Sequence, residues 1–278
     1  MKEQATYWHT PEFDRLELLR ATYHTHSFDR HVHDGYAIGI ILRGVERFYY
    51  RSAMHNASPG SVIVINPDEI HDGHAAQPAR GWSYRVFYPS VALMQQIAFQ
   101  ISGQSHHFTG TPHFAQPIMH DPDLAALLID AHAAQEFEVS ALERQSRLYL
   151  AFGLLLERYA SNRIMPRDSS DTQQAIERAR HHLENHFAQP ITLDDLAAYA
   201  GFSPFHLLRV FRSRFGMSPH RYLTYVRVKH AKTLLASGFP IREVAQATGF
   251  TDQSHLTRRF KGVVGVTPGQ YAQTTSQQ

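Results

Sequence analysis

Residues 238–271 read GFPIREVAQATGFTDQSHLTRRFKGVVGVTPGQY, and this stretch decides the fold of the C-terminal part of the chain. An apolar residue and an alanine (Val244-Ala245) are followed, after three residues, by Gly249-Phe250 and then by a basic segment. A small alanine lets a second helix cross closely, and a glycine between two helices suits a sharp turn at positive φ. The stretch therefore predicts two short helices joined by a tight turn.

The same arrangement occurs once before, between residues 196 and 219. Leu196-Ala197 is followed after three residues by Gly201-Phe202, and a basic segment comes next. The two copies also end alike, with Gly-Met-Ser-Pro at 216–219 and Gly-Val-Thr-Pro at 265–268. The second copy has one more residue than the first between its turn glycine and its core phenylalanine (Phe211 in the first copy, Phe260 in the second). Self-similarity of this kind indicates two copies of one supersecondary unit.

Local signals place the helix ends of these copies. Thr192 and Asp195 resemble a capping box, and Ser203-Pro204 is a helix cap followed by a proline in the first turn. Between the copies, residues 219–237 suit one long helix of about 25 Å. That length would hold two DNA-reading helices near one turn of DNA apart, about 34 Å.

Charge is distributed unevenly along the chain. From residue 173 onward 13 Lys+Arg stand against 6 Asp+Glu, which gives +7, and residues 1–172 carry the remaining 14 and 19, which gives −5. This asymmetry suggests that only the C-terminal part meets a polyanion. Helix, glycine turn and basic second helix together describe a DNA-reading helix-turn-helix. A helical bundle whose basic faces are merely solvated is the alternative.

Residues 173–272, and above all residues 238–271, resemble the DNA-binding region of the AraC/XylS family of bacterial transcription regulators. In that family the second helix of each unit enters the major groove of double-stranded DNA. Leu208 is apolar where a polar reader is common, so it would touch a thymine methyl or not read at all. Arg212 and Lys261 are implied to meet phosphate. The base-reading residues that the resemblance implies are Phe205, His206, Leu208 and Arg209, then Gln253, Ser254, Thr257 and Arg258.

The N-terminal part has a different pattern. Residues 37–42, 46–51, 61–65 and 83–88 are short, rich in Ile, Val, Tyr and Phe, and bounded by turn signals, which predicts strands of a sandwich or barrel. Residues 91–102, 123–134 and 140–160 have helical spacing. We therefore expect two domains, an all-β barrel with appended helices (1–160) and an all-α double helix-turn-helix (173–276), joined by a polar linker (161–172).

Three histidines lie next to the predicted strands. His31 and His33 precede the first clear strand, and His71 follows an Asn-Pro-Asp turn. This arrangement resembles the N-terminal domain of the same family, a cupin-like β-barrel, and such barrels place histidines of this kind around a divalent metal. The carboxylate that usually accompanies such a pair of histidines is missing here. Glu46 could replace it, but the neighbouring sequence does not predict where its side chain lies. Three interpretations stay open: a catalytic metal centre, a metal that helps to sense an effector, and histidines that only form hydrogen bonds.

A binding pocket for one small effector inside the barrel is the favoured role of the N-terminal domain. If Arg85 pointed inward, it would pair with a carboxylate of the effector; otherwise it lies on the polar face of its strand. The residues expected to line the pocket are His33, Tyr36, His71, Trp82, Tyr84 and Arg85, with Tyr88 beside them.

Composition narrows the function further. The chain has no cysteine, which excludes disulfides, thiolate zinc sites and thiol catalysis, and no apolar run of 18 residues, so we expect no membrane span and a cytoplasmic protein. We expect a transcription regulator rather than an enzyme, acting as a homodimer on DNA with RNA polymerase as a further partner; the sequence leaves activation and repression both open. The alternatives are a domain that only dimerises, through helix stripes in 123–160, and a metal-dependent cupin enzyme fused to a DNA-binding domain.

Overall fold

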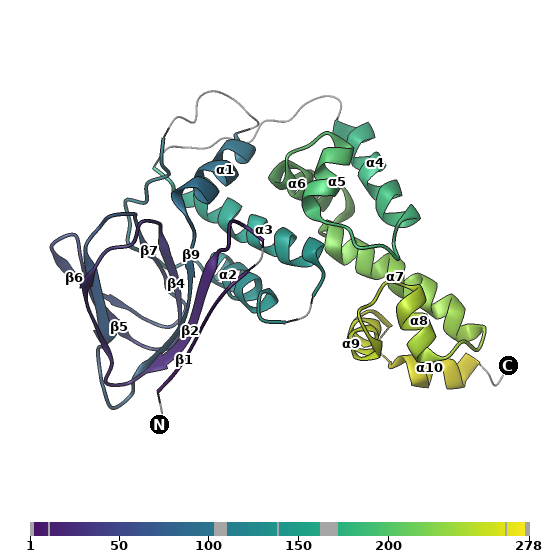
Figure 1. Cartoon of the computed structure of the whole chain (residues 1–278), viewed down its shortest axis with the longest axis horizontal. Coiled ribbons are helices and arrows are strands. Elements are labelled where there is room, and N and C mark those ends of the chain that lie inside the picture. The colour runs from purple at the N-terminus through teal and green to yellow at the C-terminus, as the bar shows by residue number, and fades with distance from the viewer. Residues whose placement is uncertain are drawn as a thin grey trace. The chain divides into compact units, whose positions relative to one another are not determined.

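The computed structural model describes residues 3–10, 12–102, 110–137, 139–161, 172–264 and 266–275 (Figure 1). The chain forms two compact units, one of Met1–Phe137 with Arg147–Arg167 and one of Glu138–Ser146 with Asp168–Gln278. Nearly all of the predicted linker, and Gly265 of the second repeat, lie outside the described residues. Within the described ranges, no helix has both the length and the apolar character needed to cross a membrane.

The first unit contains two antiparallel sheets. The six-stranded sheet has the order β1 (Gln4–His9), β2 (Glu17–Tyr23), β9 (Trp82–Tyr88), β4 (Ala37–Gly44), β7 (Val62–Ile65) and β10 (Ile118–Met119). The four-stranded sheet has the order β3 (Ser27–His31), β8 (His71–Ala75), β5 (Glu46–Tyr50) and β6 (Ala53–Ala57).

An apolar core lies between these sheets, because each contributes the inward half of its alternating side chains. Leu19, Ile41 and Val86 enter it from the six-stranded sheet, and Phe48 and Tyr50 from the other. The β-rich fold with appended helices is confirmed. The predicted strands correspond to β4, β5, β7 and β9, but in the described part of the chain the strands form two sheets and not a closed barrel.

Three helices also contribute to the first unit: α1 (Val91–Ile101), α2 (Pro122–Ala134) and α3 (Ala141–Tyr159), the last from Arg147 onward. All three lie close to their predicted ranges. In Figure 1, α2 lies against the outer face of the six-stranded sheet, and it contacts β4 and β9. Phe87 of β9 meets His132 of α2 and Phe152 of α3 at ring distances of 4.9 and 5.3 Å. The central strands are therefore buried on both faces, which explains the unbroken apolar runs of β4 and β7.

All the secondary-structure elements in the described residues of the second unit are helices. Gly201 and Gly249 adopt positive φ (77° and 76°) in the turns of the two repeats, as predicted. The Thr192 side chain accepts a hydrogen bond from the Asp195 amide, and that of Ser203 accepts one from the His206 amide. The helices are α4 (Thr172–Asn185), α5 (Leu193–Ala200), α6 (Pro204–Phe215), α7 (Pro219–Ala236), α8 (Ile241–Ala247), α9 (Gln253–Val264) and α10 (Pro268–Thr275).

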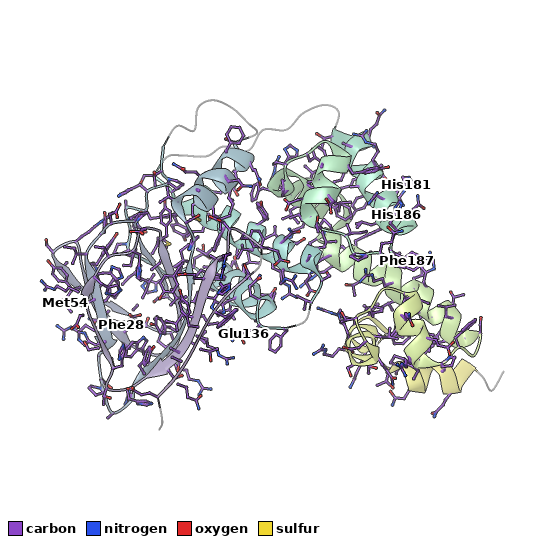
Figure 2. All side chains as sticks on the ribbon, viewed as in Figure 1. Phe28, Met54, Glu136, His181, His186 and Phe187 are labelled. Atoms are coloured by element: carbon purple, nitrogen blue, oxygen red, sulfur yellow. The ribbon has the colours of Figure 1, made fainter. Side chains whose placement is uncertain are left out.

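Helix α7 lies between the two helix-turn-helix copies, α5–α6 and α8–α9, and contacts helices of both. Its buried Arg227 donates hydrogen bonds to the carbonyls of Phe187 (2.7 Å) and Gln189 (3.0 Å) in the loop before α5. The Phe187 ring stacks on His230 of α7 at 3.9 Å, and Figure 2 shows Phe187 beside this helix. The second copy touches the same loop, because a Cβ on Gly249 would stand 2.6 Å from the Ala188 carbonyl oxygen. These contacts set the spacing of the two copies.

Candidate functional site

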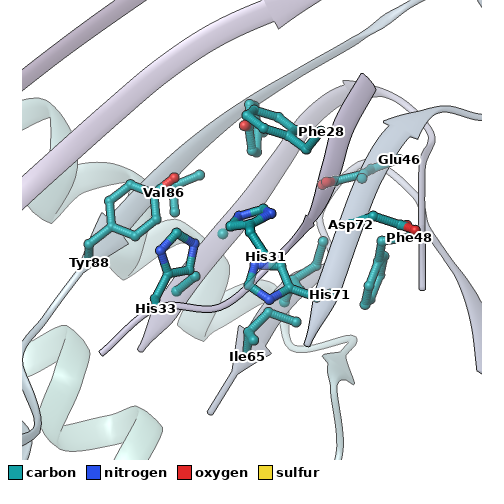
Figure 3. Close-up of a pocket in the computed structure, with 15 residues that line it drawn as sticks. Phe28, His31, His33, Glu46, Phe48, Ile65, His71, Asp72, Val86 and Tyr88 are labelled. Carbon is teal, nitrogen blue, oxygen red and sulfur yellow. The ribbon is translucent and has the colours of Figure 1, made fainter. Parts of the chain in front are cut away.

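A pocket lies between the two sheets of the first unit (Figure 3). Its empty space amounts to about 500 Å³, including the part that opens to solvent. The six-stranded sheet supplies Ala37, Gly39, Ile63, Ile65, Tyr84, Val86 and Tyr88, and the four-stranded sheet supplies Phe28, His31, Glu46, Phe48, His71, Asp72 and Gly73. His33, which follows β3, completes the wall.

Three of the histidines that line this pocket lie next to one another, as Figure 3 shows. His31 and His71 stand directly opposite each other in the antiparallel pair of β3 and β8, with ring centroids 4.3 Å apart. His33 lies 4.8 Å from His31 and 5.0 Å from His71 by the same measure. One nitrogen of each ring lies within 4.8 Å of the others. The structure thus brings together the three residues that the sequence singled out.

Backbone hydrogen bonds define the tautomers of two of these rings. Nδ1 of His31 donates to the Asp29 carbonyl at 2.7 Å, and Nδ1 of His71 donates to the Glu69 carbonyl at 3.0 Å. Because a carbonyl only accepts, Nδ1 carries the proton, and Nε2 of a neutral ring keeps its lone pair. Burial lowers the pKa of His33 to about 4 and also lowers the pKa of His71, so both imidazoles are neutral at pH 7.

Glu46 also lines the pocket, where its residue is only 8% exposed. Burial raises the pKa of its carboxyl to about 8, so the group is mostly protonated at neutral pH. Gly73 on β8 leaves room for it, since a Cβ at that position would stand 2.6 Å from Glu46 Oε1. The cluster of closely spaced donors in the described residues comprises the three histidines and does not include Glu46. The carboxylate that the sequence could not place therefore faces the pocket without joining the cluster.

The expected pocket residues do not all reach this cavity. His33, His71, Tyr84 and Tyr88 line it. Trp82 is buried in the core between the sheets. Tyr36 donates a hydrogen bond to the Pro112 carbonyl and borders a second, more polar hollow that also touches His33.

Arg85 points away from the pocket. Its neighbours Tyr84 and Val86 line the cavity, and side chains alternate along a strand, so Arg85 faces α2. There it donates to the Glu136 carboxylate and contacts Nδ1 of His132 at 2.8 Å (Glu136 is labelled in Figure 2). This placement corrects the inward interpretation of Arg85 and its pairing with an effector carboxylate. Sequence reasoning also missed Phe28 and Phe48, because β3 was not predicted and Phe48 carries no motif.

The second reading helix, α9, keeps all its expected DNA-contact residues on one face. Gln253, Ser254, Arg258 and Lys261 are exposed, and Thr257 is half-buried beside them. The opposite face buries His255, Leu256 and Phe260 in the core of this helix-turn-helix.

The first reading helix, α6, differs. Arg212 is exposed and Arg209 is half-buried, and the His206 ring stacks on Phe202 at 4.8 Å. Phe205 and Leu208, in contrast, are buried, with exposures of 5% and 0%. For Phe205 this corrects the expectation of a base contact, and for Leu208 it favours the alternative that the residue does not read bases, because buried apolar side chains serve packing.

Both halves of the chain match known families. Residues 15–152 match the AraC-like ligand binding domain, and residues 196–274 match a helix-turn-helix domain. The uncharacterized HTH-type transcriptional regulator YbfI of Bacillus subtilis is 32% identical over 232 residues, which cover 82% of this chain and 81% of that protein. The chain belongs to the AraC family of transcriptional regulators. Family membership indicates a DNA-binding regulator with a ligand-binding domain, and not an enzyme.

Other relatives match with lower identity, over less of this chain, or over less of their own length. The probable transcriptional regulator LumQ of Photobacterium leiognathi is 24% identical over 66% of this chain and 81% of its own length. The chain spans only 31% of the length of an HTH-type regulator of Staphylococcus aureus that is 23% identical to it over 84% of the chain. The C-terminal domain of AraT from Geobacillus stearothermophilus is 35% identical, with a TM-score of 0.35 over 36% of this chain and 84% of that domain.

Proposed function

We propose that this AraC-family protein is a sequence-specific DNA-binding regulator whose activity responds to a small-molecule effector bound between the two sheets. The observation that carries the proposal is the pocket itself. It opens to solvent, is walled mainly by apolar and aromatic side chains, and holds a few polar groups at fixed positions, which is the usual composition of a small-molecule site.

DNA contact is assigned to the two reading helices of the second unit. The exposed faces of α6 and α9 carry the basic residues Arg209, Arg212, Arg258 and Lys261. Gln253, Ser254 and Thr257 lie on the same face of α9 and have the side chains that read base edges in the major groove. The net charge of +7 from residue 173 onward supports binding to the phosphate backbone.

Effector contact is assigned to the pocket walls. Phe28, Phe48, Tyr84 and Tyr88 offer flat apolar surfaces, and the three histidines and Glu46 offer polar groups. A regulator of this kind must bind its effector more tightly in one conformation than in the other, or the effector shifts nothing.

The partners follow from this function. We include double-stranded DNA, a second copy of the chain, and RNA polymerase at activated promoters, and we assign the protein to the cytoplasm, where DNA is its target. The hypothesis that the N-terminal domain only dimerises through its helix stripes is less favoured. Leu124, Leu128 and Ala131 of α2, and Leu148, Phe152 and Leu155 of α3, are buried within the chain itself.

The test begins with genome-wide mapping of bound sites, because the genes beside them indicate which compounds to try as effectors. Each compound is then added to the purified full-length chain, and a ligand of the native state raises the melting temperature. The pocket-filling variant Gly39→Leu should abolish this rise and the effector response while it retains DNA binding. At Gly39 a Cβ finds its nearest neighbours at 3.9 Å, so the backbone accepts a side chain that then fills the cavity.

Ala53→Leu is the matched control, since Ala53 is exposed on β6 and does not line the pocket. It should respond to the effector as the unsubstituted chain does. A Gly39→Leu variant that keeps the full effector response would place the effector elsewhere and reject this pocket.

A further inference from the structure

We propose that the effector of this pocket is an organic cation, a protonated amine attached to an apolar or aromatic body, and that the carboxyl group of Glu46 recognises it. Because the same cavity is the effector site of the proposed function, this assignment rests on that function. The pocket wall, one buried carboxyl group and the rings beside it all point to this class of molecule.

The ionisable groups of the pocket wall favour a cation. In the described part of the chain no lysine or arginine lines the cavity, so an anionic effector would find neither of these opposite charges there. The wall contains the carboxyl groups of Glu46 and Asp72, and its histidines His33 and His71 are neutral because burial lowers their pKa. The pocket thus offers negative charge and hydrogen-bond acceptors to a ligand.

The two carboxyl groups differ in their partners. Asp72 accepts a hydrogen bond from the Tyr49 amide at 2.8 Å, and its Oδ2 lies 3.7 Å from Nε of Arg30. Glu46 is only 8% exposed, and within the described ranges no group donates a hydrogen bond to its carboxyl. A buried charge is stable only when it is paired, so the Glu46 carboxyl leaves the opposite charge to be supplied by a ligand.

Aromatic rings lie beside the Glu46 carboxyl. A Cβ built on Gly73 would stand 2.6 Å from Glu46 Oε1 and 3.8 Å from Cδ2 of Phe28, so the carboxyl and this ring meet above the same glycine. Phe48 is two residues beyond Glu46 on β5, and alternation along the strand directs both side chains into the pocket (Figure 3). Burial, and then the Glu46 carboxylate, raise the pKa of the Tyr84 hydroxyl, which agrees with a position of that ring near the carboxyl.

A carboxylate among aromatic rings attracts an ammonium group through two interactions. The carboxylate accepts charge-assisted hydrogen bonds from the N–H groups, and the ring faces attract the positive charge most strongly where water is excluded. Glu46 by itself is mostly protonated at neutral pH, and an ammonium group beside it stabilises the ionised form, so the carboxyl proton passes to solvent on binding. The apolar body of the effector would then contact Ile63, Ile65 and Val86.

The experiment compares three probes of similar size that differ in charge: 2-phenylethylamine, 2-phenylethanol and phenylacetate. Each is titrated into the purified full-length chain, and calorimetry and the melting temperature report binding. We expect the amine to bind about tenfold more tightly than the alcohol or phenylacetate, or better. Glu46→Gln keeps the shape of the side chain without its charge and should weaken amine binding by about 10- to 100-fold, the range for loss of a charged hydrogen bond.

Glu157→Gln is the matched control, because Glu157 is exposed on α3 and does not line the pocket. It should bind the amine as the unsubstituted chain does. Circular dichroism checks that each variant is folded. Glu46→Asp, which keeps the charge on a shorter side chain, should retain part of the preference for the amine that Glu46→Gln loses.

Failure of the amine to bind, or equal affinity for the amine and the alcohol, would overturn the proposal, as would amine binding that Glu46→Gln leaves unchanged. Tighter binding of the alcohol or of phenylacetate that Gly39→Leu abolishes would overturn the cationic class and still support the pocket as the effector site. Amine binding that depends on Glu46 but leaves affinity for the mapped DNA sites unchanged would support the cation site and count against the regulator hypothesis.

Discussion

The two helix-turn-helix copies share a motif but present different surfaces. Counted back from the core residues Phe211 and Phe260, Leu208 of α6 corresponds to Thr257 of α9, and Arg209 corresponds to Arg258. In the first copy these positions are buried and half-buried, and in the second they are half-buried and exposed. The repeat therefore preserves the fold of the unit while its reading face differs, and we expect the second copy to contribute more to base recognition.

The largest effect on stability should come from Leu208, the buried residue of the pair Leu208 and Thr257. Leu208→Ala removes a fully buried side chain and should lower the free energy of unfolding by about 2–5 kcal/mol. Thr257→Ala, at the corresponding position, should cost about 0.5 kcal/mol or less and instead change base preference. Denaturant titrations, with binding to a randomised site library, measure both. Equal losses of stability in Leu208→Ala and Thr257→Ala would show that the two positions are more alike than the exposures of their side chains indicate.

The turn glycines provide a second contrast. Both have positive φ, so an alanine is strained at either position by about 1–2 kcal/mol. Gly201 has open space around its Cα, whereas a Cβ on Gly249 would press against the Ala188 backbone at 2.6 Å. Gly249→Ala should therefore lower the free energy of unfolding by about 2–4 kcal/mol, and Gly201→Ala by less. If Gly201→Ala proved the more damaging change, the close packing of the second turn would not limit stability.

Substitutions of Arg209 and Arg258, which occupy corresponding positions of the two copies, test base recognition. Arg258→Ala should weaken binding to the preferred site by about 1–3 kcal/mol and relax one position of its sequence, because an exposed arginine in a reading helix suits guanine. Arg209→Ala should change sequence preference less. Arg242→Ala, at an exposed position of α8 outside the reading helices, is the control for lost charge. Affinity profiles over a site library would contradict the assignment if Arg258→Ala kept its full sequence preference.

The smallest effect concerns His255 of α9. Burial lowers its pKa in the folded protein, so the unfolded chain binds more protons as pH falls below the ordinary histidine pKa of 6.5. Its contribution to stability is complete above pH 6.5 and is lost at lower pH, by less than about 1.4 kcal/mol per pH unit. His255→Asn should flatten the stability curve between pH 6.5 and 5. A curve that kept its slope would assign the effect to other groups.

Local patterns predicted much of this molecule. The caps at Thr192 and Ser203 and the left-handed glycines at 201 and 249 were all visible in the sequence, because each depends on residues within a few positions of itself. The short strands β1, β3 and β8 were not predicted, since their side chains are polar or mixed and their pairing partners lie far along the chain.

The sequence by itself determined the double helix-turn-helix, the order of the two domains and the three histidines as candidates. Only the tertiary structure decided which side chains meet. Arg85 faces Glu136, 51 residues further on, and Glu46 enters the pocket beside Gly73, 27 residues away. Phe205 and Leu208 stand at reader positions of the motif and yet are buried. The physical reason is that helix ends and turns arise from neighbouring residues, whereas the face a side chain presents depends on what packs against its element.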